Sequence, residues 1–240
     1  MNSNVDSAFY FVNKLEQSNN DKHLAFANGA LSYLNELKGD SKKSKEKLAV
    51  AFEYLNKMPN SNEKIQLQSY LYNFGGLSEW KRRNFSKALE NYHQGVKLSN
   101  QIRDIIQLVK FKNNIALINE AVGNYTLAIK NLKEVDNFVD QNEGAYTKEQ
   151  FLSNKSNINL SLAGAYESYY VKNRKKFFLL DSAEYFYKKT ITYSQDLVDN
   201  KVVAKLSLGN VYNWKKDYNN AEKTYYDIVF FAQQNNLKEE

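Results

Sequence analysis

The chain has 240 residues, a formal net charge of +6, one Pro, nine Gly and no Cys. The lack of Cys excludes disulfide frameworks, Cys-ligated zinc and thiol nucleophiles. The scarcity of Pro and Gly disfavours an all-β or loop-rich fold and predicts helix throughout. Lys and Glu are interleaved along most of the sequence, which is more typical of solvated helix faces than of a nucleic-acid or lipid surface.

Residues 1–60 have helical composition but only a loose repeat. No basic segment followed by an apolar one opens the chain, and no long apolar run occurs in it, so we expect a soluble chain without a signal peptide or a spanning helix. The segment Asp6-Ser7-Ala8-Phe9-Tyr10-Phe11 is similar to residues 181–186, which open a second helix further on. The sequence is therefore predicted to begin within a repeat.

Residues 62–236 contain a clear repeat. Three times, a small residue precedes an Ala by twelve positions: Gly76 and Ala88, Ala116 and Ala128, Gly209 and Ala221. An aromatic residue lies in each turn (Phe85, Tyr125, Tyr218), and a large residue follows each Ala by four positions (Tyr92, Leu132, Tyr225). A fourth copy joins Ala163 to Ala183 through an insertion, residues 171–180, which contains Lys172, Arg174, Lys175 and Lys176.

The spacing has a physical reason. A small residue in the first helix of a pair lets the second helix approach closely. The Ala in the second helix is expected to face that small residue across the contact. The aromatic residues at the turn and after the Ala are expected to face the next repeat, where stacking of neighbours closes the core.

These residues resemble tetratricopeptide repeats (TPR), clearly over 62–236 and more loosely before. The resemblance implies an all-α, right-handed superhelical solenoid of about five antiparallel helix pairs that occupies residues 1–240. The repeat period reaches about forty residues instead of the usual thirty-four, which implies longer helices or wider loops.

No constellation for catalysis is evident. His23 and His93 are the only imidazoles and lie far apart, and Gly75-Gly76 and Gly144 are not part of a phosphate-binding loop. No His-carboxylate spacing indicates a metal. We therefore expect no catalytic residue, no metal and no cofactor. The basic insertion next to Phe177 and Phe178 could contact single-stranded nucleic acid, but one cluster is weak support, and no nucleic-acid partner is expected.

The resemblance also implies a concave groove along the first helices. Positions i, i+4 and i+7 share a helix face, and they predict a peptide-binding groove formed by Tyr70, Phe74, Leu77, Lys110, Asn114, Leu117, Asn157, Ser161 and Asn210, with Gly164, Val203 and Ser207 completing the triplets. One charge in this set disfavours capture of a terminal carboxylate. The amides instead suit an extended peptide backbone, with apolar anchors beside them. The alternative that some of these side chains face the core stays open.

Three functions are compatible with the sequence. Residues 180–189 are similar to repeats of Bacteroidetes regulators, so the first is the sensor or scaffold part of a larger bacterial signalling or transcriptional regulator, periplasmic or cytoplasmic. The second is a stand-alone assembly or chaperone adaptor, and the third is a nucleic-acid-binding repeat. Because both ends of the sequence fall within a repeat, we expect a piece of a longer protein, with self-association or an adjoining domain at the ends.

Overall fold

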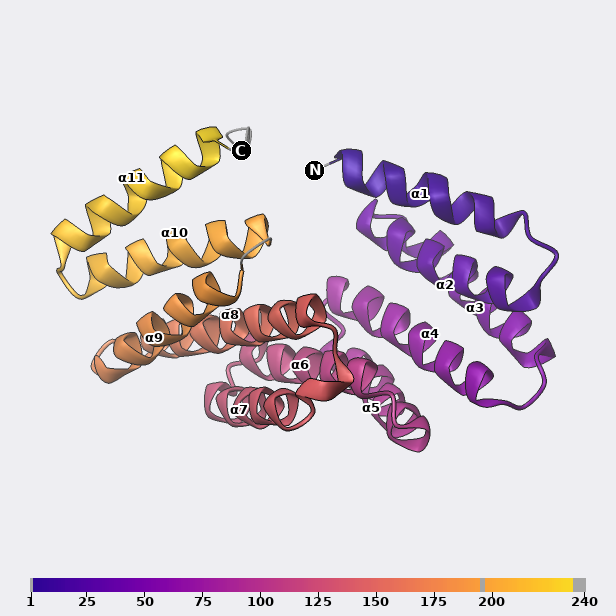
Figure 1. Cartoon of the computed structure of the whole chain (residues 1–240). Helices are drawn as coiled ribbons and strands as arrows, with labels where there is room; N and C mark the ends of the chain where they lie inside the picture. Colours follow the sequence, from indigo (N-terminus) through magenta and orange to yellow (C-terminus); the bar gives the residue numbers. More distant parts are fainter. Residues whose placement is uncertain (1, 195–196, 235–240) are drawn as a thin grey trace. The chain divides into compact units, whose positions relative to one another are not determined.

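The computed structural model describes residues 2–194 and 197–234, and Figure 1 shows its helices. These residues form helices and contain no strand, so the all-α prediction is confirmed. The helices are α1 (Asn2–Glu16), α2 (Asp21–Leu37), α3 (Ser41–Lys57), α4 (Asn62–Lys81), α5 (Phe85–Ile102), α6 (Ile105–Ala121), α7 (Tyr125–Gln141), α8 (Lys148–Lys172), α9 (Phe178–Tyr193), α10 (Val198–Trp214) and α11 (Tyr218–Gln234), with a short 3-10 helix at Glu143–Ala145.

The chain forms two compact units, residues 1–118 and 119–240, with the boundary inside α6. In unit 1, α1 packs on α2, the first helices α2 and α4 pair with the second helices α3 and α5, and α2 also packs on α4. In unit 2, α8 pairs with α9 and α10 with α11, while α7 packs on α8. Each unit thus has the pair-on-pair packing of helical repeats. The continuous solenoid over residues 1–240 stays a prediction.

Side-chain caps begin several of the helices. The side chains of Asn20, Asp40 and Ser61 accept hydrogen bonds from backbone amides of the first turns of α2, α3 and α4. Thr147 and Gln150 form a reciprocal capping box at the start of α8. Each cap satisfies an amide that the helix itself leaves unbonded, so these boundaries are encoded locally.

One turn joins most first helices to their second helices. It places a left-handed residue at Gly39, Arg83, Gly123 and Lys216, with φ of 86°, 62°, 85° and 61°. The next amide reaches back to a carbonyl five residues earlier, as from Asn84 N to Glu79 O at 2.8 Å. This bond satisfies the carbonyls at the helix end. The α8–α9 connection differs, because the predicted insertion forms the end of α8, a loop over residues 173–177 and the start of α9.

The predicted close packing within helix pairs is confirmed. A Cβ atom on Gly76 would lie 2.7 and 2.8 Å from Cδ1 and Cζ of Tyr92, and one on Gly209 would lie 2.5 Å from Cε1 of Tyr225. The nearest neighbour of each glycine is the ring four positions after the Ala, and Ala88 and Ala221 themselves are buried. Only glycine admits a ring at these two positions.

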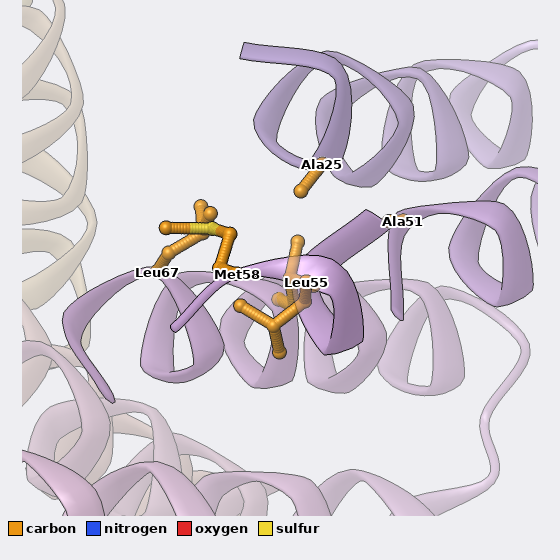
Figure 2. Packing of buried hydrophobic residues seen from close by; sticks show 6 residues of the cluster. Ala25, Ala51, Leu55, Met58 and Leu67 are labelled. Carbon is orange, nitrogen blue, oxygen red and sulfur yellow. The ribbon is translucent and has the colours of Figure 1, made fainter. Parts of the chain in front are cut away.

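The pair α2–α3 follows the same rule with different residues, Ser in place of Gly and Ala, and these were not predicted. Ser32 and Ser44 stand twelve positions apart and are 0% and 1% exposed. Around this pair lies a core cluster from α2, α3 and α4, in which Ala25, Ala51, Leu55, Met58 and Leu67 converge (Figure 2). Residues 1–60 therefore contain a helix pair packed as tightly as the clear repeats.

The three aromatic residues at the turns, Phe85, Tyr125 and Tyr218, differ in their contacts and exposure. The Tyr125 ring stacks on Tyr169 of α8, with centroids 5.4 Å apart, and Phe85 packs on the cluster around Tyr92. Both face the next first helix, as predicted. Tyr218 is 62% exposed, and the expectation that it faces a following repeat stays a prediction. No described helix follows α11 to supply the covering surface.

Candidate peptide-binding surfaces on the first helices

The predicted aromatic anchors of unit 1 lie together. Tyr70 and Phe74 of α4 each meet the ring of Phe26 of α2 edge-on, with centroids 6.3 and 5.7 Å apart. All three rings are half-buried and pack against the core cluster of Figure 2 on one side. Leu77 lies one turn further along α4 and is also half-buried. Phe26 was not predicted because residues 1–60 carry only a loose repeat, which does not fix the helix positions.

Polar side chains connect α4 with α6, the next first helix of unit 1. Asn114 Nδ2 lies 3.5 Å from Asn73 Oδ1, and Gln66 Nε2 donates to Asp104 Oδ2 at 3.2 Å. Lys110 is exposed one turn before Asn114, and Leu117 is half-buried after it. Burial raises the pKa of Tyr70, and the charge of Asp104 adds to this effect. The structure thus assembles the predicted residues of α4 and α6 into an amide and aromatic surface, which we call the unit 1 surface.

In unit 2, Asn157 and Ser161 of α8 lie beside α10. Asn200 Nδ2 donates to Asn157 Oδ1 at 2.8 Å and to Ser156 Oγ at 2.9 Å. Ser161 Oγ donates to the backbone oxygen of Asn157 at 3.0 Å. Asn157 is exposed, and its own Nδ2 has no hydrogen-bond partner among the described residues. Asn200, outside the predicted triplets, therefore orients an amide that can still donate to a ligand.

Asn210 is placed differently. Its Oδ1 accepts a hydrogen bond from the hydroxyl of Tyr225 at 2.7 Å, and Gly209 beside it receives the ring of the same Tyr225. The side chain of Asn210 is thus bound within the α10–α11 pair, as in the alternative that the sequence left open. Asn157 and Ser161 remain accessible instead, and together with Asn200 they form what we call the unit 2 surface.

Unit 2 also contains two hydrogen-bonded carboxylates on its first helices, Glu120 of α6 and Glu167 of α8. Ser168 Oγ donates to Glu120 Oε1 at 2.8 Å, and the Tyr187 hydroxyl donates to Glu167. Burial raises the pKa of Glu120, with the charge of Glu167 adding to it, and burial likewise raises the pKa of Glu167. Glu120 follows Leu117 by three positions, and Glu167 follows Gly164 by three. One further turn of the same helical period would have predicted both.

Glu120→Gln should stabilise the protein at neutral pH. A carboxyl whose folded pKa is raised contributes most below its unfolded pKa, and that contribution is lost as the pH rises through the folded value. The wild type should therefore lose stability from about pH 4.5 upward, and the amide, which cannot ionise, should remove part of that slope. Thermal melts between pH 4 and 7.5 measure this. A steeper slope in the variant would contradict the assignment.

Other chemistry is sparse in the described part of the chain. His23 Nδ1 lies 3.0 Å from Ser18 Oγ at the exposed start of α2, and His93 is exposed on α5. No group of three or more His, Asp or Glu side chains there could hold a metal ion. None of the described helices combines the length and the apolarity needed to cross a membrane.

The fold defines the class: a TPR-like helical repeat structure. BtubC (BKLC) from P. vanneervenii superimposes with a TM-score of 0.70 at 16% identity, covering 99% of this chain and 92% of that chain. A Podosopora anserina putative kinesin light chain with nearly identical TPR-like repeats gives a TM-score of 0.57 at 15% identity, covering 90% of this chain and 99% of that chain. Its Q17M form gives a TM-score of 0.58 at 14% identity, covering 92% of this chain and 100% of that chain.

No protein-family model matches the sequence, and no curated protein matches it. The structural likeness therefore establishes the fold alone.

Proposed function

We propose that the chain binds an extended peptide or a protein segment along its first helices. The observation that carries this proposal is the pairing of amides between neighbouring first helices, Asn73 with Asn114 in unit 1 and Asn157 with Asn200 in unit 2. An extended peptide exposes alternating donors and acceptors, which primary amides match on both sides. In unit 1 the rings of Tyr70 and Phe74 stand beside the amides as apolar anchors.

The biological setting we propose is the sensor or scaffold part of a bacterial signalling or transcriptional regulator. The similarity of residues 180–189 to repeats of such regulators supports it. A stand-alone assembly or chaperone adaptor would use the same surfaces and differ only in lacking an attached output module. The full open reading frame distinguishes the two, because an output module encoded in the same chain identifies the regulator and its absence identifies the adaptor.

Asn157→Ala and Asn114→Ala test the surfaces on a peptide selected from a random display library with the immobilised protein. Each variant should weaken binding of a peptide seated on its own unit by about tenfold, since one or two hydrogen bonds of roughly 1 kcal/mol each are lost. Isothermal titration calorimetry measures the dissociation constant. The free energy of unfolding should change by less than about 1 kcal/mol in Asn157→Ala, because Asn157 is exposed.

Asn100→Ala and Asn137→Ala are matched controls, since both residues are exposed Asn on the second helices α5 and α7. They should leave the dissociation constant unchanged. If the control variants weaken binding while the first-helix variants do not, the peptide binds the opposite faces of the units and the proposal is wrong.

A further inference from the structure

One edge of unit 2 exposes apolar side chains at three successive turns. Phe177 and Phe178, consecutive residues at the start of α9, are 61% and 62% exposed. Val171 at the end of α8, Tyr218 at the start of α11, and Val122 and Leu127 around the α6–α7 turn are also exposed. Large exposed apolar patches mark surfaces that contact a partner or a membrane. The proposed peptide surface does not include these residues.

Ring contacts hold the three turns together as one edge. Tyr125 after the α6–α7 turn stacks on Tyr169 of α8, and Tyr170 of α8 packs against Trp214 of α10 with centroids 5.7 Å apart. Tyr170 also contacts the ring of Phe177 at 5.9 Å. In Figure 1 the α8–α9 and α10–α11 turns lie at the same end of their helices. These ring contacts therefore link the three turns that carry the exposed groups.

The same edge carries positive charge without matching carboxylates. The Arg174 guanidinium lies over the rings of Tyr170 and Trp214, 5.7 Å from each centroid, and Lys176 Nζ lies 2.7 Å from the Tyr169 hydroxyl. Lys172 and Lys175 are exposed beside them. In the described part of the chain no ion pair joins any of these four cations to a carboxylate.

Two carboxylates lie near these cations, and one of them is paired with a different lysine. Asp181 binds Lys215 at 2.6 Å, and Asp217 accepts a hydrogen bond from Asn220 at 2.7 Å. Asp217 keeps its negative charge, because its Asn220 donor is neutral, but Lys172, Arg174, Lys175 and Lys176 outnumber it, so the edge presents net positive charge to a partner.

We infer that this edge docks on an anionic phospholipid bilayer. Protruding Phe and Val side chains enter the boundary between headgroups and acyl chains, while the flanking Lys and Arg contact anionic headgroups. Single-stranded nucleic acid fits less well, because Arg174 already covers the Tyr170 and Trp214 faces on which bases would stack. An acidic peptide would use the charges but would leave the aliphatic side chains uncovered.

Vesicle sedimentation with the full chain tests the inference. Vesicles of phosphatidylcholine with about 30 mol % phosphatidylserine should bind the protein at low salt, and pure phosphatidylcholine should bind it much less. Lys172→Glu combined with Lys175→Glu should lower the binding constant by at least about tenfold, since one basic residue near an anionic surface contributes about fivefold. Phe178→Ser should also lower it, at unchanged charge.

Two matched controls lie in unit 1. Lys42→Glu combined with Lys45→Glu makes the same change of charge on exposed lysines of α3, and Phe11→Ser removes a ring that is equally exposed on α1. Both should bind vesicles like the wild type. Equal losses in the controls, or no binding to anionic vesicles at all, would overturn the inference. So would oligothymidine or polyglutamate binding as tightly as the vesicles while Phe178→Ser has no effect, because the edge would then be a general polyanion surface.

Discussion

Gly76→Ala should lower the free energy of unfolding by roughly 2–3 kcal/mol, although Ala is the better helix former. The added Cβ would lie within 3 Å of three carbons of the Tyr92 ring. Tyr92 is 0% exposed, so its ring has no free space to move into. The α4–α5 pair must then separate or the ring must leave its rotamer, and denaturant melts monitored by circular dichroism measure the cost.

Gly164→Ala is the control, because the nearest atom to its added Cβ is Glu120 Oε1 at 4.0 Å. This variant should gain about 0.5–1 kcal/mol from helix propensity. A double-mutant cycle with Tyr92→Leu sharpens the test, since Ala116 and Leu132 already combine Ala with Leu at the same spacing. Tyr92→Leu should cost less in the Gly76→Ala background than in the wild type. Additive effects would show that the two side chains do not oppose each other.

Lys155→Met should destabilise unit 2 by about 3 kcal/mol. Lys155 is 1% exposed, and its Nζ lies 2.6 Å from Asp136 Oδ1 and 2.8 Å from Asp140 Oδ1, which joins α8 to α7. Its removal leaves the largely buried Asp136 without a cation. Asp136→Leu in the same chain should recover part of the loss, because the buried charge is then gone. Chemical denaturation of both variants measures the difference.

Lys188→Met removes an ion pair with Glu184 that is largely exposed on the lysine side. It should cost about 0.5 kcal/mol or less, which makes it the comparison for Lys155→Met. Similar losses for the two variants would show that the Lys155 cluster is hydrated and contributes no more than a surface pair.

The Lys155 cluster also predicts a loss of stability at high pH. Burial acts to lower the pKa of Lys155, but the hydrogen bonds and charges of Asp136 and Asp140 outweigh it and raise that pKa above the ordinary 10.5. A raised folded pKa contributes stability that is complete below the unfolded value and disappears as the pH rises through the folded one. Alkaline unfolding of the wild type should therefore begin above pH 10.5 and have a smaller amplitude in Lys155→Met.

The aromatic residues of α4 in the candidate surfaces could be predicted from the sequence. The polar residues could be predicted only in part. Tyr70 and Phe74 share a helix face by their spacing alone, whereas their partner Phe26 lies in a pair whose small residues are Ser32 and Ser44. Serine is small enough for the contact but is also common in loops, so its spacing stands out less than that of Gly and Ala. The residues that neighbour Asn114 and Asn157 come from other helices, which a single helical period does not relate.

The sequence by itself determined the helical class and, over residues 62–236, the positions of closest approach within the helix pairs, because these depend on local propensity and on the sizes of residues at fixed spacing. Gly76, Ala88 and the turn residue Tyr125 could all be assigned in this way. Only the tertiary structure decided the direction of polar side chains. Asn157 and Asn210 occupy similar predicted positions, yet Asn210 is bound by Tyr225 and Asn157 remains exposed. The difference arises from side chains of neighbouring helices that compete for the same amide, and those contacts exist only once the helices have packed.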